Sequence, residues 1–389
     1  MEKKKVVNLD MKQYGMFLAL IAIYLIFAVI TGGKNLSPMN INNLIMQNGY
    51  VVILAIGMLL CVLTGNVDLG VGSVVALCGG IVGVLLIDYK VNMWIAILVA
   101  ILVGLVVGMF AGFFIAYLGI PPFVVTLATM LMGRGLTYTM LQAQTKGPFD
   151  ASYNYIGAGF LPTVKVPFGA GTLDLVSLLV AGIATVVVIL AEMKSINTKK
   201  KYGFATNPLW QIILKNAVIL LIVWFVFIKL AQYNGLPFQL LIMGVLIAIY
   251  GFITSQTVAG RQIYALGGNR KAANLSGIDT NKVFFWVYTN MGILAAIAGI
   301  VLCSRNGSAT PKAGDGFEMD AIASCYIGGA AVAGGAGTIT GAVVGAFVMG
   351  ILNNGMSLYG WSTDIQKIVK GVVLLGAVTI DILSKRKKK

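Results

Sequence analysis

The sequence predicts an all-α fold, a polytopic bundle of membrane-spanning helices that forms one domain over residues 1–389. Hydrophobic residues make up 58% of the chain and charged residues only 11%, against roughly 25% charged in average soluble domains. Apolar runs of about 17–25 residues follow one another with short polar breaks, which is typical of transmembrane helices. Most of these runs lack the polar face that a helix of a soluble protein needs.

About twelve apolar runs are predicted as spans, forming a core of ten and an inserted helical hairpin over 173–231. In chain order they cover 14–32, 44–64, 67–87, 93–118, 121–142, 173–192, 211–231, 236–257, 284–303, 321–335, 338–358 and 366–383. The first run follows a basic start and has no small-residue cleavage site, so we expect it to stay as an anchor.

The distribution of basic residues predicts which segments face the cytoplasm. Lysine and arginine concentrate in the N-terminal segment, in 193–210, in 258–283 and in the C-terminal segment, and are sparse in the other loops. The positive-inside rule therefore predicts that both termini are cytoplasmic. This requires an even number of crossings, so the glycine cluster 334–337 is expected to be a tight turn, or part of a re-entrant pair, within 321–358.

Several functions are excluded by what the chain lacks. The net charge of +15 is explained by this topology, so no nucleic-acid partner is expected. Histidine is absent, and Cys61, Cys78, Cys303 and Cys325 have no metal-like spacing, so no metal site, disulfide or catalytic residue is predicted. No Gly-x-x-x-x-Gly-Lys-Ser/Thr phosphate loop is present, so the chain should not hydrolyse ATP by that route and should be no enzyme.

A polar segment over 260–278 interrupts the apolar sequence. It is basic and rich in small residues, yet its apolar residues are spaced as on a short surface helix. A loop that only joined two spans would not need this spacing. We therefore expect a cytoplasmic partner to bind it.

Polar residues within the spans are candidates for a translocation path: Asn66, Asp68, Ser73, Thr126, Thr129, Asn353 and Asn354. Hydroxyl and amide groups both donate and accept hydrogen bonds, which suits a neutral polyhydroxylated solute. Interhelical hydrogen bonding explains them nearly as well. For Asp68, the helix N-cap at the cytoplasmic interface and a turn lining a cavity both remain open. Asp68, Arg134 and Lys370 are the only charges expected at membrane depth.

Glycines recur at four-residue spacing in the span 93–118, at Gly104, Gly108 and Gly112. Small residues at this spacing let helices approach closely in lipid, so we expect tight packing there, with hinge-like flexibility as the alternative. The loops 143–172 and 304–320 are punctuated by glycine and proline. Each is either a solvated loop or a docking surface for an extracellular partner.

Four segments together resemble one known family: 63–73, 122–127, 260–278 and 327–337. They are similar, in the same order, to the permease subunits of bacterial ABC importers for monosaccharides such as ribose, galactose and xylose. The inserted hairpin 173–231 and the length of 389 residues look more like the xylose-type or multiple-monosaccharide permeases.

The resemblance implies a multi-pass protein of the bacterial plasma (inner) membrane that pairs with a second copy of itself. It implies an ABC ATPase chain on the cytoplasmic side, which holds the ATP and Mg²⁺, so no cofactor is expected in this chain. It also implies an extracellular sugar-binding protein. The cytoplasmic loop 258–283 would insert a coupling helix into the ATPase through Gly260, Arg261, Tyr264, Gly267, Gly268, Asn269, Arg270, Lys271, Ala272, Leu275 and Gly277.

The leading hypothesis is thus an ATP-driven importer of xylose, galactose, glucose or a similar monosaccharide. The alternatives are an ion-coupled secondary sugar carrier and a same-family importer of a nucleoside or branched-chain amino acid. Scarce intramembrane charges and the missing histidine argue against the ion-coupled carrier. The missing histidine and the absence of paired carboxylates argue against a membrane enzyme acting on lipid-linked sugars.

Overall fold

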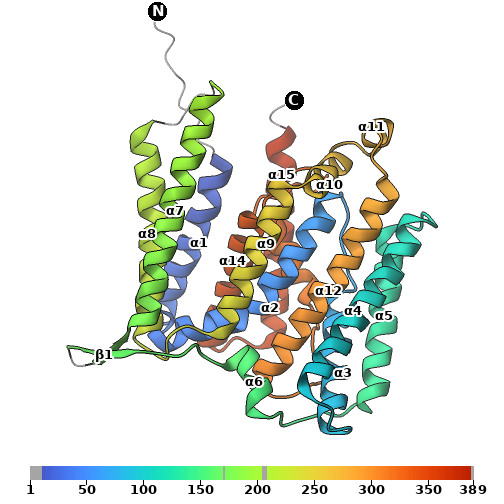
Figure 1. Ribbon diagram of the computed structural model, residues 1–389, viewed down its shortest axis with the longest axis horizontal. Coiled ribbons are helices and arrows are strands. Elements are labelled where there is room, and N and C mark those ends of the chain that lie inside the picture. Colours follow the sequence, from blue (N-terminus) through green and yellow to red (C-terminus); the bar gives the residue numbers. More distant parts are fainter. Residues whose placement is uncertain (1–10, 170, 204–207, 387–389) are drawn as a thin grey trace, which may run out of the picture.

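The computed structural model describes residues 11–169, 171–203 and 208–386, and these are almost entirely helical (Figure 1). The helices are α1 (Met11–Ile30), the 3-10 helix η1 (Lys34–Leu36), α2 (Pro38–Leu63), α3 (Val71–Ile87), α4 (Met93–Ala116), α5 (Pro122–Leu141), α6 (Ala151–Ala158), α7 (Leu175–Lys201), α8 (Leu209–Ala231), α9 (Phe238–Gln256), α10 (Val258–Gly268), α11 (Arg270–Leu275), α12 (Thr280–Asn306), α13 (Phe317–Ile327), α14 (Ile339–Tyr359) and α15 (Thr363–Arg386). The strands β1 (Lys165–Phe168) and β2 (Gly171–Asp174) form an antiparallel hairpin.

Eight helices in the described part of the chain are long and apolar enough to cross a membrane: α2, α4, α5, α7, α8, α9, α12 and α14. Two shorter apolar helices, Leu18–Ile30 and Val71–Ile87, lie beside them. The expectation of a polytopic helical membrane protein is therefore confirmed. Every predicted span overlaps a helix, but not every helix has the predicted length.

The two ends of the bundle differ. The start of α1, the end of α15 and the helices α10 and α11 lie at one end, which we term the α10 end (Figure 1). The helix α6 and the hairpin β1–β2 lie at the opposite end, the α6 end. Loops at the two ends therefore belong to two separate surfaces.

The centre of the bundle is formed by α2 and α12. In the most apolar 18-residue stretch of α2, 83% of the residues are buried, whereas in that of the peripheral helix α8 only 6% are. A helix that is apolar on all sides is stable either inside a bundle or against lipid. Helix α2 is therefore an inner helix of the bundle, whereas α8 has the exposure of a helix that faces lipid.

The close contact of α4 with α12 depends on glycines, as predicted. A Cβ atom added at Gly108 would lie 2.7 Å from the carbonyl oxygen of Tyr288, and one at Gly104 would lie 2.5 Å from that of Gly292. Small residues let two backbones approach in lipid, where van der Waals contact is a main source of helix association. The packing interpretation of the glycine spacing is confirmed.

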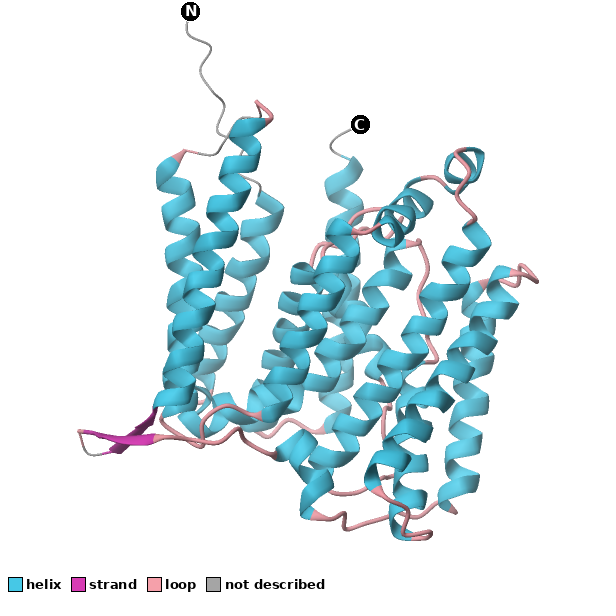
Figure 2. Cartoon of the chain, viewed as in Figure 1, coloured by secondary structure: helices cyan, strands magenta, loops and turns pink. Residues whose placement is uncertain are grey.

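Helices α1, α7 and α8 stand together to one side of the bundle (Figure 2). The predicted hairpin 173–231 is thus an antiparallel pair, α7 and α8. Lys215 of α8 forms an ion pair with Glu192 of α7, and the indole N–H of Trp224 donates to Thr185 at 3.1 Å. Polar contacts within lipid fix the register of the pair.

Two predicted spans are wrong as continuous helices. The run 321–335 forms only the short helix α13, which ends at Ile327 and is followed by the non-helical segment 328–338. Eleven residues rise about 16 Å, about half the thickness of the hydrocarbon core. The glycine turn is confirmed, because Gly334 and Gly335 have φ values of 84° and 72°. Likewise, the first four residues of the third run, 67–87, belong to the non-helical segment 64–70, and the run becomes helical only at Val71.

Candidate functional site

The segment 260–278 forms two short helices, where the sequence predicted one. Thr257 caps α10 by accepting the backbone N–H of Gly260 at 3.2 Å. Asn269 has an extended backbone, with φ of −162° and ψ of 105°, and its side chain caps α11 through the N–H of Ala272 at 3.0 Å. Asparagine in this role ends one helix and starts the next, because its side chain satisfies a free amide.

The inner face of α10 packs on the backbone of the bundle. Gly260, Ile263 and Leu266 are buried. A Cβ atom at Gly267 would lie 1.7 Å from the carbonyl oxygen of Leu63, the last residue of α2. Only glycine allows this approach.

The same inner face contacts the glycine turn that precedes α14. The hydroxyl of Tyr264 donates to the carbonyl oxygen of Gly337 at 2.7 Å. The N–H of Gly335 donates to the carbonyl oxygen of Leu63 at 2.9 Å. Two non-helical segments, 64–70 and 328–338, interrupt the membrane helices; we term them the helix interruptions. Helix α10 contacts both, the first at Leu63, which directly precedes it, and the second at Gly337.

The outer face of the pair α10–α11 is exposed. Leu275 at the end of α11 is 91% exposed. The predicted partner-facing residues that are exposed are Arg261, Gly268, Asn269, Arg270, Lys271, Ala272, Leu275 and Gly277. Gly260, Tyr264 and Gly267 instead face the bundle, so the predicted set divides into a contact face and a supporting face.

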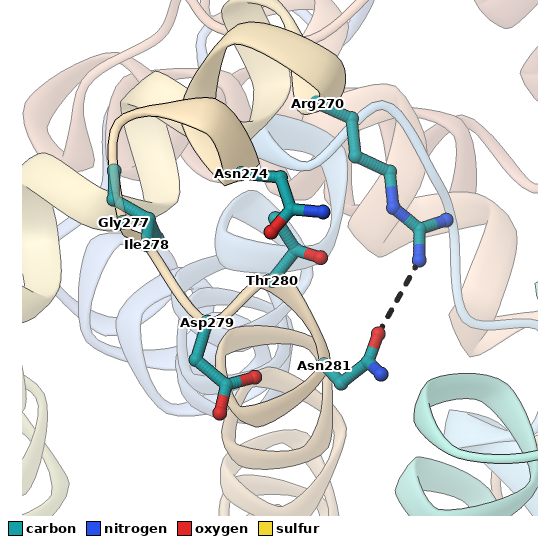
Figure 3. Close-up of a pocket in the computed structure, with 7 residues that line it drawn as sticks. All are labelled: Arg270, Asn274, Gly277, Ile278, Asp279, Thr280 and Asn281. Carbon is teal, nitrogen blue, oxygen red and sulfur yellow. Dashed lines mark hydrogen bonds between the residues drawn. The ribbon is translucent and has the colours of Figure 1, made fainter.

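The side chain of Arg270 makes two contacts with α12. Its guanidinium sits 4.9 Å from the ring centroid of Phe284, and it reaches Asn281 of α12 at 3.5 Å (Figure 3). Cation–π contact of this kind orients a guanidinium without neutralising it. Arg261 and Lys271 are therefore the cations that project outward.

A pocket of about 390 Å³ opens between α11 and the start of α12. Figure 3 shows the residues that line it, which are Arg270, Asn274, Gly277, Ile278, Asp279, Thr280 and Asn281. Asp279 caps α12, and the backbone N–H of Lys282 that it accepts at 3.0 Å lowers the pKa of this carboxyl below its ordinary value. The pocket rim thus carries a cation and a carboxylate within a mostly polar lining.

Asp68 is not the N-cap of α3, and it does not lie at either end of the bundle. Gly70 occupies the cap position, and the Asp68 carboxylate accepts its N–H at 2.8 Å. Asp68 and Val71 line a void of about 10 Å³ with Gly108 of α4 and Met291 of α12, which are near the middle of their helices. Because 64–70 is not helical, the chain reaches this depth before α3 begins. Of the two interpretations of Asp68, the helix N-cap and the turn that lines a cavity, the structure fits the turn.

The hydroxyl candidates lie around the start of α3. Thr126 and Thr129 are buried on α5, and their hydroxyls donate to carbonyls of their own helix, those of Phe123 and Val125. Ser73 is buried without a hydrogen-bond partner for its hydroxyl. Asn66 is half-buried and donates to the carbonyl of Thr64 at 3.2 Å. These residues share one region with Asp68.

The two asparagines of α14 lie in a different region. Asn354 is buried against α2, where it exchanges hydrogen bonds of 2.9 and 3.1 Å with Asn40. Its role is the interhelical bonding that was the alternative interpretation. Asn353 is half-buried and donates to Asp320 at 3.4 Å, and its own oxygen has no partner.

The expectation of only three charges at membrane depth is wrong. Asp320 of α13 is 1% exposed and pairs with Lys370 of α15 at 2.9 Å. Glu192 and Lys215 form a further pair between α7 and α8. The predicted span began at 321, so Asp320 fell one residue outside it. A carboxylate next to an apolar run with a lysine in a later run was the signal that could have found this pair.

Arg134 has a supporting role. One of its guanidinium nitrogens donates to the carbonyls of Pro311 and Ala313, at 3.0 and 2.6 Å. These bonds hold the loop between α12 and α13 against α5. Within the residues that the structure describes, no group of three or more His, Cys, Asp or Glu could hold a metal ion.

The fold and these surfaces define the class of protein, a multi-pass membrane permease. The chain belongs to the family described as the permease component of the branched-chain amino acid transport system, which matches residues 40–378. Membership of this family implies that the chain has no catalytic activity of its own.

Individual relatives cover almost the whole chain. It is 36% identical over 387 residues to the xylose transport system permease protein XylH of Haemophilus influenzae, with 100% of both chains covered. It is 35% identical over 380 residues to XylH of Escherichia coli (strain K12), covering 98% of this chain and 94% of that protein. It is 33% identical over 368 residues to the ribose import permease protein RbsC of the same strain, covering 93% and 92%. No solved structure matches the chain.

These relatives confirm the resemblance to monosaccharide importer permeases that the four sequence segments predicted. The chain is a multi-pass protein of the bacterial inner membrane. A permease of this kind works with an ATPase and a substrate-binding partner.

Proposed function

We propose that this chain is the membrane-spanning subunit of an ATP-driven importer that moves a monosaccharide into the cell. ATP and Mg²⁺ would be bound by a separate ATPase chain. One observation carries the proposal: α10 has an exposed outer face, and its inner face contacts the backbone at both helix interruptions. A force applied by a partner on the outer face would therefore reach two breaks in the membrane helices.

The proposed orientation places the α10 end in the cytoplasm, with both termini there. Lys199, Lys200 and Lys201 are exposed at the end of α7, and basic residues follow α15 in the sequence. This charge bias supports the orientation. Twelve helices then enter the membrane, with α3 and α13 crossing only part of it.

Movement would pass from α10 to the path through backbone contacts. The carbonyl of Leu63 contacts both Gly267 and the N–H of Gly335. From Leu63 the non-helical segment 64–70 leads to the start of α3, which lies against α4, α5 and α12. Packed backbones transmit displacement because they cannot compress. ATP-driven movement of the partner would thus shift the start of α3.

The proposed path includes Asn66, Asp68, Ser73, Thr126 and Thr129 near this helix start, with Asn353 on α14. A broken helix at membrane depth with polar groups beside it is a common construction of substrate paths in transporters. Two copies of the chain would form the path between them, and an extracellular binding protein would supply most of the affinity. The relatives named for xylose and ribose, which are both pentoses, support a pentose as cargo.

The test is uptake by the chain in proteoliposomes with its cognate ATPase and sugar-binding protein. The double variant Arg261→Glu/Lys271→Glu, and separately Leu275→Asp, should lose ATPase association and at least about tenfold in xylose uptake, because an interface loses its anchors. The control Lys34→Glu changes an exposed cation at the opposite end of the bundle and should behave as the parent chain.

Three results would count against the proposal. Unchanged ATPase association in the double variant would remove the coupling role of α10–α11. Uptake that survives ATP depletion but collapses with an uncoupler would indicate an ion-coupled carrier. Transport of a nucleoside or a branched-chain amino acid, with no sugar transported, would change the cargo.

A further inference from the structure

The hairpin β1–β2 has one apolar face. Its register pairs Val166 with Leu173 and Phe168 with Gly171, and the same ladder continues to Val164, whose carbonyl accepts the N–H of Leu175 at 2.9 Å. Side chains of directly opposed residues project to the same side of a sheet. Val164, Val166 and Phe168 therefore share a face with Leu173 and Leu175.

The opposite face of the hairpin carries its charged and hydroxyl side chains. Lys165 lies opposite Asp174, and Pro167 opposite Thr172. Alternation of this kind is typical of a strand with one face in water and one face covered. In the described chain, however, the apolar face is open: Phe168 is 70% exposed, Val164 55% and Val166 39%.

The hairpin is held firmly at its base. One carboxylate oxygen of Asp174 accepts the N–H of Val164 at 2.9 Å, and the other accepts the N–H and hydroxyl of Ser177 at 2.9 and 2.6 Å. Asp174 is 1% exposed. The strands are thereby joined to the first turn of α7, so the apolar face has a defined direction.

The position of the hairpin favours lipid as the group that covers this face. It extends sideways from the start of α7, away from the rest of the bundle and across the direction of the helices (Figure 2). Such a direction runs along the membrane surface. The apolar face continues into the exposed apolar residues of α7, where Leu175 is 44% and Leu179 65% exposed. Exposed apolar side chains on an apolar membrane-spanning helix are suited to contact with lipid.

We propose that the hairpin is an interfacial anchor whose apolar face lies on the membrane leaflet at the α6 end. Phe168 and Val166 enter the boundary between headgroups and acyl chains, and Lys165 and Thr172 face water. Aromatic and apolar residues are stable at this boundary when a polar side remains in water. The anchor fixes the depth of the α7–α8 pair in the membrane.

The experiment compares the two faces by spin labelling in lipid nanodiscs, where both membrane surfaces are open to solution. Phe168→Cys reports on the apolar face and Thr172→Cys on the polar face. The four native cysteines are all buried, so a nitroxide reagent should label the introduced residue. Collision with oxygen, which dissolves in lipid, is compared with collision with a water-soluble nickel chelate.

The ratio of oxygen to nickel collision should be about tenfold higher at position 168 than at 172, because apolar solutes concentrate in the acyl region. Equal ratios at the two positions would overturn the proposal. So would protection of position 168 that requires added sugar-binding protein, or that requires two copies of the chain in one nanodisc.

A second measurement holds even if the labelled variants fold poorly. Phe168→Asp and Thr172→Asp each add one charge to the hairpin. Only the first should shift hydrogen exchange in the first turns of α7 to faster rates. Equal exchange in the two variants would contradict an anchor on the apolar face.

Discussion

The ammonium group of Lys370 lies 2.9 Å from the carboxylate of Asp320, which joins the last helix of the chain to the half-length helix α13. The Asp320 side chain is 2% exposed and that of Lys370 22%. Asn353 of α14 donates to the same carboxylate at 3.4 Å. Three helices therefore meet at one buried charge, and the short helix α13 depends on it for its position.

Removing one member of this pair should destabilise the protein strongly. Lys370→Met or Asp320→Asn alone should each cost about 3 kcal/mol, because the remaining group loses its partner within the bundle. The double variant should cost less than the sum of the two. Thermal unfolding of the purified protein in detergent measures all three.

Lys367 and Asp315 provide the matched control one turn away. This pair has nearly the same length, 3.0 Å, but its side chains are 65% and 66% exposed. Lys367→Met should therefore cost less than about 1 kcal/mol. Equal losses at positions 367 and 370 would show that burial does not set the strength of the Lys370 pair.

Two adjacent glycines of α10 should respond differently to substitution. In Gly267→Ala, the new Cβ would lie 1.7 Å from the carbonyl of Leu63, so α10 must move away from α2. Gly268→Ala meets no atom within 4 Å. Gly267→Ala should lower stability by about 1–3 kcal/mol and reduce uptake, while Gly268→Ala should leave stability near the parent value.

Measuring stability and uptake together separates two causes of failure. A Gly267→Ala protein of parent stability with lost uptake would show that the α10–α2 contact carries movement. A Gly267→Ala protein with the stability and uptake of the parent would show that the close contact of Gly267 with Leu63 has no role.

The sequence predicted the helices well where the apolar runs were long. Runs such as 93–118 and 121–142 match α4 and α5 within about two residues, because twenty apolar residues in lipid have few alternatives to a helix. The predictions that were wrong concern 321–335 and the start of the third run. In both, glycines follow apolar residues, and hydropathy alone does not distinguish a helix from an extended chain buried in protein.

The candidate site was predicted in part. The segment 260–278 was correctly separated from the spans, but its division at Asn269 depends on one backbone conformation. The contact of Gly267 with Leu63 joins residues 204 positions apart in the sequence, and no local pattern indicates such a contact. The Asp320–Lys370 pair was missed for a different reason: the predicted span began at 321, which left Asp320 one residue outside the apolar run.

The glycines that join α4 to α12 give a third prediction. Gly108→Ala should destabilise the protein by about 1–3 kcal/mol, because its Cβ would meet the carbonyls of Tyr288 and Thr289 at 2.7 and 2.8 Å. Gly182→Ala on α7 meets no atom within 4 Å. It should instead be neutral or stabilising by about 0.5–1 kcal/mol, as for a glycine replaced in a helix. Thermal unfolding that ranks the two in the opposite order would contradict this packing.

The base of the hairpin should show a specific pH dependence. Burial alone would raise the pKa of Asp174, but hydrogen bonds from the hydroxyl and N–H of Ser177, and from the N–H groups of Val164 and Val176, lower it below the ordinary value of 3.8. A carboxyl whose pKa is lowered by folding contributes stability above its unfolded pKa. That contribution is lost as the pH falls through the lower, folded value.

Asp174→Asn removes this contribution, so it provides the comparison. The melting temperature of the parent should exceed that of the variant at about pH 6, and the difference should shrink below about pH 4. Other acidic groups titrate in both proteins and cancel in the difference. Ser177→Ala removes one of the hydrogen bonds that lower the pKa of Asp174. In a Ser177→Ala background, the difference in melting temperature caused by Asp174→Asn should therefore be smaller but not zero. A parent–variant difference that stays constant from neutral to acid pH would mean that Asp174 does not act as a charged cap for the hairpin and α7.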